Sequence, residues 1–534
     1  MPPKYPQALD EGRLEKAERV LCKIFEVSEL REHQKLAGRN ILQGKSTVYD
    51  VPTGGGKTLA FWYPLAYNWD SKDGISVSQK VALVVSPLNA LMNSQVEALQ
   101  KRGIPALAVN NEKDEGGQIR VKHRVIFISP ETAVSTPFHE KVLKIRTFRE
   151  HCIEVVIDEA HCASEWGKEF RPEYAQLTKL LARLPSGLPV LLASATMPED
   201  VVHDVLFKVG LPQDSARIAV SNAKYNIALS VRILQHPGST YADLFTLFPV
   251  EPDAEFPQTL IYVNNRKEAE EIQDFLRRHC PSHLPTSSVE FYHRFLTDKR
   301  KAEIAEGLRS GRLHCVIATD ALGMGMDFLG IMRVILWHEP LTFLSLIQKL
   351  GHGVRQLSDL GEAILFITKA SYAKHLTDLE SERDEDGDGD QPESPNTMEE
   401  TGVDRIAAID QEDPEINAGP RGKKKKARDH KYFSLFIAAS GCRRIPWDEF
   451  FSNRGKLSLF VPPENSCCCD NCQPEAFPVD TIKISYPYPT CAPRTAWFSE
   501  ALSAEVTDAL RRWRSEAILI YYPGQLSIVR SALG

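Results

Sequence analysis

The first 370 or so residues contain short runs that are apolar throughout, separated by longer stretches with helical patterning. Strands without polar alternation are covered on both faces, which is typical of a parallel sheet. Strands that alternate with helices indicate βαβ units. The runs are 81–85, 125–128, 155–157, 190–193, 259–263, 316–319, 334–337 and 363–367. Because they form two groups separated near residues 221–229, we predict two α/β lobes, residues 1–222 and 223–377.

The composition is that of an ordinary globular protein. Of the 534 residues, 43% are hydrophobic and 25% are charged, which excludes a fibrous or mostly disordered chain. No apolar run approaches the roughly 20 residues of a membrane span, and no secretory signal is visible at the N-terminus. We therefore expect a soluble intracellular protein without a membrane partner. Since the net charge is −7, any surface that binds phosphate groups must be local.

Three further segments follow the two lobes. Residues 378–430 are acidic and then basic, and we predict a disordered linker because so few apolar side chains are available for burial. The basic run 421–428 is a candidate nuclear import signal or phosphate contact, with a solvated charge run as the alternative. Residues 431–475 form a predicted small cysteine-containing unit. Residues 476–534 form a predicted tail with one amphipathic helix, whose apolar residues from Phe498 to Trp513 lie on one stripe.

A glycine-rich segment follows the apolar run 48–51 and precedes a predicted helix. In such a turn the backbone N–H groups can approach phosphate oxygens, a lysine can bind the β- and γ-phosphates, and a hydroxyl can hold Mg²⁺. The strict pattern has a glycine where this chain has Val51, so a chance glycine-rich turn is the alternative. The candidate ATP-binding residues are Thr53, Gly54, Gly55, Gly56, Lys57 and Thr58.

Two carboxylates end the apolar run 155–157, in the segment Asp158-Glu159-Ala160-His161. A Mg²⁺-binding aspartate and a water-orienting glutamate are placed in this way beside a phosphate-binding loop. An acidic strand end without function is the plain alternative. In a chain that also carries the glycine-rich loop, we favour the catalytic interpretation.

Six segments together resemble the motifs of superfamily-two helicases, and within them those of RecQ-like DNA helicases. They are Arg31–Gln34, Val85–Gln95, Asp158–Pro172, Ser194–Thr196, Ile261–Arg266 and Ala318–Asp327. The resemblance covers roughly residues 25–472 and is most specific in Asp158–Pro172. It implies two RecA-like parallel-sheet lobes that clasp ATP and Mg²⁺, with 3′→5′ movement on single-stranded or forked DNA. RNA is left open as a substrate, and we expect a nuclear location.

The resemblance also implies catalytic roles for single residues. Lys57 and Thr58 would bind phosphate and Mg²⁺. Asp158 would bind the Mg²⁺, and Glu159 would orient the attacking water. Arg355 would complete the ATP site from the second lobe.

Other implied roles concern the adenine base and the DNA. Gln34, with Arg31, would select adenine. Trp166 and Phe170 lie just past the acidic motif, where aromatic rings can stack on unpaired bases for about 1–3 kcal/mol each. Packing in the core is the alternative for both, and the polar surroundings favour stacking for Trp166. Residues expected to couple the nucleotide state to DNA are Thr196, Trp166, Phe170, Arg171, Thr319 and Asp320.

Near residue 350 the chain departs from the family pattern Q-x-x-G-R-x-G-R. His352 replaces the first arginine; it is mostly neutral at pH 7 and lacks the guanidinium fork. Val354 replaces a glycine, which matters if this position needs a positive φ. Arg355 is in register and is the candidate arginine finger, a contact worth roughly 10³–10⁵ in rate in well-measured systems.

These departures leave a second function open. Tyr292–Leu296 also differs from the family, which usually has small residues after His293. The alternative is a nucleotide-gated nucleic-acid binding protein with weak or no unwinding. A P-loop kinase for small molecules is disfavoured, because it would need neither a second lobe nor the segment Ala318–Asp327.

Cysteines gather near residue 470, and a further cysteine lies at position 442. Four thiolates around Zn²⁺ need a close pair, such as Cys469 and Cys472, and a second pair brought in by a helix or turn. The spacing resembles the RecQ zinc subdomain, which implies structural Zn²⁺ bound by Cys442, Cys468, Cys469 and Cys472, with Cys467 as the alternative to Cys468. A disulfide is disfavoured inside the cell, and free thiols are the other alternative. RecQ-like enzymes usually continue with a winged-helix domain, and no complete one can be traced in residues 476–534.

Overall fold

The computed structural model describes the greater part of the chain. The described residues are 5–6, 8–69, 80–109, 123–165, 173–247, 256–279, 284–322, 330–355, 359–386, 420–459, 464–479, 481–482, 504–509 and 512. They divide into two compact units. Among these residues, no helix combines the length and the apolarity that crossing a membrane requires.

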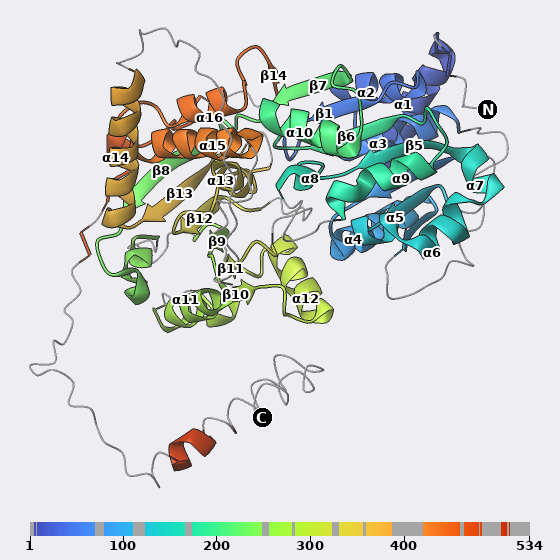
Figure 1. Cartoon of the computed structure of the whole chain (residues 1–534). Helices are drawn as coiled ribbons and strands as arrows, with labels where there is room; N and C mark the ends of the chain where they lie inside the picture. Colours follow the sequence, from blue (N-terminus) through green and yellow to red (C-terminus); the bar gives the residue numbers. More distant parts are fainter. Residues whose placement is uncertain are drawn as a thin grey trace, which may run out of the picture. The chain divides into compact units, whose positions relative to one another are not determined.

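The first unit comprises Met1–Tyr225, Pro340–Gly351 and Lys369–Pro462. Its sheet has eight strands in the order β14-β7-β1-β6-β5-β2-β4-β3, and each neighbouring pair is parallel (Figure 1). The strands are β1 (Thr47–Asp50), β2 (Val81–Val85), β3 (Ala106–Val109), β4 (Val125–Ile128), β5 (Cys152–Ile157), β6 (Val190–Ser194), β7 (Ala216–Ser221) and β14 (Leu457–Ser458). The four apolar runs predicted as strands in this part of the chain are confirmed as β2, β4, β5 and β6.

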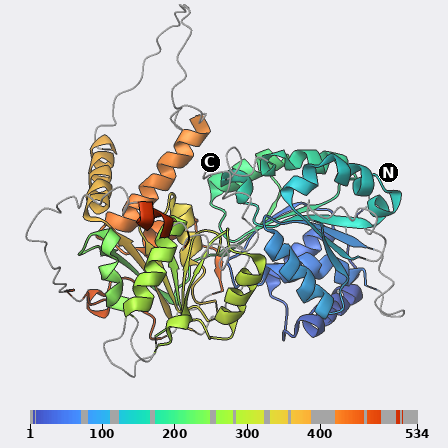
Figure 2. The ribbon, with the colours of Figure 1, turned by 90° about the horizontal axis from the view of Figure 1, so that it is seen from below.

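Helices cover both faces of this sheet. In Figure 2 the blue helices lie on one face and the teal to green helices on the other. The first helix is an example. It begins where the Asp10 side chain accepts the Arg13 N–H, and Leu14, Ala17 and Leu21 form its buried stripe. The helices are α1 (Glu11–Phe25), α2 (Glu32–Leu42), α3 (Lys57–Tyr67), α4 (Asn89–Lys101), α5 (Pro130–Val134), α6 (Thr136–Phe138), α7 (Arg146–His151), α8 (Cys162–Glu165), α9 (Leu177–Arg183) and α10 (Glu199–Val209).

Four later helices also belong to the first unit: α13 (Phe343–Leu350), α14 (Lys369–Asp386), α15 (Pro420–Ala438) and α16 (Arg444–Phe450). Their aromatic residues pack together, with the Phe343 ring 5.8 Å from Phe436 and 5.1 Å from Phe450. Trp447 of α16 donates its indole N–H to Asn222 Oδ1 at 3.1 Å. The structure divides the predicted unit 431–475: up to Pro462 it belongs to the first unit, where α15 and α16 bury their apolar faces, and from Pro463 it belongs to the second.

The second unit comprises Asn226–Glu339, His352–Thr368 and the chain from Pro463 onward. Its six-stranded parallel sheet has the order β10-β11-β9-β12-β13-β8. Trp337, Ile317 and Phe366 pack in its core with Ile272 of the covering helix. The elements are β8 (Ile227–Ile233), β9 (Thr259–Tyr262), α11 (Arg266–His279), β10 (Val289–Tyr292), α12 (Asp298–Arg309), β11 (Cys315–Ala318), β12 (Arg333–Trp337) and β13 (Gly361–Ile367). The prediction of two parallel-sheet lobes is confirmed.

The predicted linker 378–430 is helical at both ends. Helix α14 extends to Asp386 and α15 begins at Pro420, so the prediction of disorder is wrong for these two stretches. The physical reason is that the two helices pack against each other, as the hydrogen bond between His375 and Ser434 shows. Residues 387–419 lie outside the described residues. So does most of the predicted tail helix, of which 504–509 are described and helical.

Candidate functional site

The glycine-rich loop begins directly after the buried strand β1. Gly54 and Gly56 have φ angles of 84° and 77°, in the left-handed region that favours glycine. A Cβ at Gly55 would lie 2.9 Å from the Pro52 carbonyl oxygen, so this position also excludes larger residues. Helix α3 then begins at Lys57. The loop therefore has the backbone that phosphate binding at a helix N-terminus needs.

Side chains from α2 hold this loop. Gln34 donates its side-chain amide to the Gly56 carbonyl at 2.8 Å and accepts the Arg31 backbone N–H at 2.8 Å. Arg31 donates to the Gly54 carbonyl at 3.3 Å, and Lys57 Nζ donates to the Val51 carbonyl at 3.0 Å. The structure thus brings the two predicted adenine-selecting residues to the loop, where Gln34 is 2% exposed.

Asp158 and Glu159 follow β5 at the same edge of the sheet. The Asp158 backbone N–H donates to the Val85 carbonyl, and the Asp158 carboxylate accepts the Glu159 backbone N–H at 3.0 Å. Burial and, to a smaller extent, the Glu159 carboxylate raise the pKa of Asp158 to about 7, against the opposing effect of the Lys57 charge. Glu159 has a φ of 49°, an uncommon conformation for a non-glycine residue that often marks functional sites.

A buried hydrogen-bond network joins the acidic motif to β6 and α13. His161 Nδ1 lies 2.7 Å from Ser194 Oγ, and His161 Nε2 lies 2.7 Å from the side-chain amide of Gln348. The same amide donates to Thr196 Oγ1 at 2.8 Å. Gln348 therefore contacts two motifs that lie more than 150 residues earlier in the chain. Thr196, predicted as a coupling residue, is 4% exposed.

A buried ion pair at the base of the phosphate loop was not predicted from the sequence. Lys456 Nζ lies 3.1 Å from Asp50 Oδ2, and the two side chains are 12% and 3% exposed. Lys456 precedes β14, which pairs with β7 at Leu457↔Val220. Leu459 packs against the core of the first unit. The one available signal was Asp50 itself, because a carboxylate at the end of a buried strand requires a partner.

The second unit contains the altered segment and the predicted coupling residues after β11. The Thr319 N–H donates to the Tyr292 carbonyl at 3.2 Å, and Asp320 is exposed. His352 Nδ1 lies 2.6 Å from the Tyr262 hydroxyl, and burial raises the pKa of that hydroxyl while Arg355 lowers it. Val354 has a φ of 41°, so this position does have the positive φ that glycine would adopt without strain.

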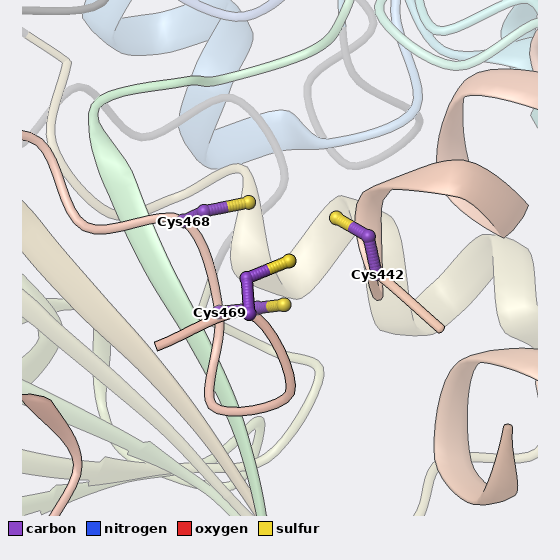
Figure 3. Close-up of side chains that lie close together, drawn as sticks. Cys442, Cys468 and Cys469 are labelled. Carbon is purple, nitrogen blue, oxygen red and sulfur yellow. The ribbon is translucent and has the colours of Figure 1, made fainter. Parts of the chain in front are cut away.

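Three of the predicted zinc ligands lie close together in the second unit, where the sulfur atoms of Cys468, Cys469 and Cys472 are within 4.8 Å of one another. Figure 3 labels Cys468 and Cys469 together with Cys442, which belongs to the first unit. The segment with the last three cysteines pairs with β8, since the Leu229 N–H donates to the Cys468 carbonyl and the Asp470 N–H donates to the Leu229 carbonyl. The thiols are not joined in disulfides. A four-thiol donor set of this kind fits Zn²⁺.

Three of the predicted DNA-contacting residues, Trp166, Phe170 and Arg171, lie outside the described residues. Thr53 and Thr58 flank the glycines and are half-buried. The structure thus brings the residues expected to bind phosphate, Mg²⁺ and adenine to one edge of the first sheet.

Comparisons with known proteins agree with this geometry. The DEAD/DEAH box helicase family matches residues 31–205, and the helicase conserved C-terminal domain matches residues 243–356. The probable ATP-dependent DNA helicase RecS of Bacillus subtilis is 31% identical over 64% of this chain and 64% of that protein. The ATP-dependent DNA helicase RecQ of Pasteurella multocida is 28% identical over 66% of this chain and 52% of its own length. The ATP-dependent DNA helicase hus2/rqh1 of Schizosaccharomyces pombe is 28% identical, with 27% of its length covered.

Solved structures with the same fold include two proteins bound to nucleic acid. The DUF1998 helicase MrfA bound to DNA has a TM-score of 0.55 at 19% identity, over 71% of this chain and 54% of that one. Mss116p bound to single-stranded RNA and AMP-PNP has a TM-score of 0.54 at 17% identity, over 71% and 80%. At these identities the likeness shows the fold alone.

The two parallel sheets, the phosphate loop and the acidic motif define a superfamily-two helicase. Within that superfamily, the chain is similar to RecQ-like helicases, as the RecS and RecQ relatives named above show. It spans 64% or less of the length of each of the three relatives named above.

The Asp50–Lys456 pair generates a prediction for stability. We expect Lys456→Met to destabilise the first unit by about 3–5 kcal/mol, because it leaves a buried carboxylate without its cation. The double variant Asp50→Asn/Lys456→Met should recover most of this loss. Urea unfolding of the full chain measures both, with Lys426→Met on the exposed surface as the control. A Lys456→Met midpoint equal to that of the control would contradict the prediction.

Gln348 generates a prediction for coupling within the helicase core. Gln348→Ala removes hydrogen bonds to Thr196 and His161 and leaves both side chains buried, at a cost of about 1–3 kcal/mol. We expect ATP binding to persist while stimulation of ATP hydrolysis by DNA falls at least about tenfold, which corresponds to about 1.4 kcal/mol. The control is Leu341→Ala, at a fully exposed position just before α13. Normal stimulation in Gln348→Ala would show that the network is not needed for coupling.

Proposed function

We propose that this protein is an ATP-dependent DNA helicase or translocase of RecQ type, which couples ATP hydrolysis to 3′→5′ movement on single-stranded DNA. The proposal is supported above all by one arrangement: Lys57, Asp158 and Thr196 each follow a neighbouring strand of one parallel sheet, in a chain of RecQ-like sequence. DNA is favoured over RNA because the relatives reported above are DNA helicases. The 3′→5′ polarity, forked DNA as a substrate and a nuclear location rest on the resemblance.

The proposed roles at the nucleotide follow from the chemistry of the side chains. Lys57 and Thr58 bind phosphate and the Mg²⁺ that accompanies ATP, and Asp158 binds the Mg²⁺. To do so, Lys57 exchanges its bond to the Val51 carbonyl for one to a phosphate oxygen. Glu159 orients the attacking water. Thr58 and Asp158 would hold the Mg²⁺, which would supply positive charge opposite the charge that develops on the phosphate oxygens.

The remaining proposed roles concern adenine, the second unit and the DNA. Gln34 and Arg31 lie at the loop and select the base. Arg355 acts as the arginine finger. Trp166 and Phe170 stack on unpaired bases. Arg171, Thr319 and Asp320 transmit the nucleotide state to the DNA-binding surface.

Zinc is part of the proposal. Cys442, Cys468, Cys469 and Cys472 would bind structural Zn²⁺, since four thiolates complete the coordination of the ion and leave no open position. The mutual distances of the Cys468, Cys469 and Cys472 sulfur atoms support this, and Cys467 remains the alternative to Cys468.

Steady-state ATPase assays with and without single-stranded DNA test the core of the proposal. We expect Lys57→Ala to abolish activity, because the charge on the β- and γ-phosphates is lost. Arg355→Ala should lower kcat by about 10³-fold or more with little change in KM. Lys45→Ala, at an exposed position before β1, is the control. Partial duplexes with a 3′ or a 5′ single-stranded end, made of DNA or RNA, then test polarity and substrate.

Each outcome of these assays is informative. DNA-stimulated hydrolysis that collapses in Arg355→Ala supports a working motor. Tight ATP and DNA binding with negligible turnover in wild type would favour the nucleotide-gated binding protein, since His352 cannot supply the fork of the arginine it replaces. Unchanged activity in Lys57→Ala would sink the assignment of the ATP site.

The zinc proposal is tested by the metal content of purified protein. We expect Cys469→Ser to lose the ion and to lower the thermal midpoint, because binding free energy at a structural site is folding free energy. Cys22→Ser, a half-buried thiol in α1, is the control. Comparing Cys467→Ser with Cys468→Ser identifies the fourth ligand. Full zinc content in Cys469→Ser would remove the metal from the proposal.

A further inference from the structure

A second group of metal-ligating side chains lies on α14 and α15, apart from the cysteines. His375, Asp378 and His430 each place a candidate ligand atom within 4.8 Å of the others. His375 and Asp378 are three residues apart on α14, which puts them on the same helix face. His430 comes from α15, with its Nε2 atom 3.4 Å from Asp378 Oδ2 and its ring 5.9 Å from that of His375. Three donors from two helices therefore converge on one point.

The orientation of His375 is fixed from behind. His375 is 5% exposed, and its Nδ1 atom lies 2.8 Å from the hydroxyl of Ser434, which is itself 1% exposed. Ser434 stands one helical turn after His430 on α15. Histidines that bind metals commonly use one ring nitrogen for a hydrogen bond that holds the ring and the other for the ion. In this arrangement His375 Nε2 is the ligand atom.

We propose that His375, Asp378 and His430 bind a divalent transition-metal ion of the zinc class, which cross-links α14 to α15. Two imidazoles and one carboxylate are a usual donor set for such ions, and water completes the coordination. An ion pair between His430 and Asp378 would require only two groups. That ion pair does not account for His375, whose imidazole is held by the buried Ser434 hydroxyl close to the other two groups.

A cross-link at this point would stabilise a pairing that the chain does not enforce locally. Residues 387–419 separate the two helices, so their association does not follow from a short turn. Metal binding adds free energy to the folded state alone, and that free energy would hold α15 against α14.

The position of α15 matters for the ATP site, an argument that rests on the proposed function. Asp429, next to His430, accepts the backbone N–H groups of Phe343 and Leu344 at 2.8 and 3.2 Å. These groups begin α13, whose Gln348 contacts His161 and Thr196. An ion that fixes α15 would therefore also fix α13 and the network beside the acidic motif.

Zinc stoichiometry of the full chain tests the site without any assay of activity. After equilibration with Zn²⁺ and removal of free metal, we expect His430→Ala and Asp378→Asn each to bind about one ion fewer per chain than wild type. His430 is half exposed, so its loss should leave the fold intact, and His203→Ala on the exposed face of α10 is the control. Equal zinc content in wild type and His430→Ala would overturn the proposal.

Cobalt distinguishes this site from the cysteines. Co²⁺ bound by nitrogen and oxygen lacks the sulfur charge-transfer band that Co²⁺ bound by thiolates shows. We expect Cys469→Ser protein to retain a cobalt spectrum without that band, and Cys469→Ser/His430→Ala protein to lose it. No cobalt spectrum in folded Cys469→Ser protein would overturn the site.

ATPase assays test separately whether metal binding at this site affects ATP hydrolysis through α13. Added Zn²⁺ should raise DNA-stimulated turnover of wild type but not of His430→Ala. A loss of bound zinc with unchanged turnover would support the site and overturn the coupling through α13. If wild type shows no turnover under any condition, the proposed function fails while the zinc measurement still decides the site.

Discussion

The parallel register of β1, β5 and β6 is the constraint on which the candidate site depends. Asp50 pairs with Ser194 across β1 and β6, and Ile157 pairs with Leu192 across β5 and β6, so the three strands end within two residues of one another. Loops that follow parallel strands in order must then meet at one edge. The glycine-rich loop comes from a segment more than a hundred residues before Asp158 and Thr196, and the sheet brings the three together.

Helix α15 connects much of what is added to that sheet. Within one turn, Arg428 pairs with Asp200 of α10 at 2.7 Å, Asp429 accepts the first N–H groups of α13, and His430 lies beside Asp378 of α14. Each contact is polar, directional and made to a different element. A rigid-body shift of α15 would therefore change all of them together, which is how a change at one helix can reach the network around Gln348.

The strands and the phosphate loop were predictable, because buried parallel strands are apolar throughout and a phosphate loop needs glycines at fixed positions. The helical ends of the predicted linker, in α14 and α15, were not predictable. Their sequences are acidic or basic and give no sign of the tertiary contacts that stabilise these helices. The Asp50–Lys456 pair spans 406 residues, and no local pattern encodes such a partner. The closeness of Cys468, Cys469 and Cys472 was predictable for the opposite reason, because these residues are neighbours in sequence. Which helices joined which unit depended on long-range packing and was missed.

The altered segment of the second unit has a defined structure of its own. Val354 adopts a conformation that costs a β-branched residue of order 1–3 kcal/mol, yet its side chain is 1% exposed and its N–H donates to the Ile331 carbonyl. Gly361 leaves room for the Val354 side chain, because a Cβ at position 361 would collide with it. His352 is anchored to Tyr262. Strain that surrounding residues accommodate in this way is typical of a segment that is held in one conformation by its neighbours.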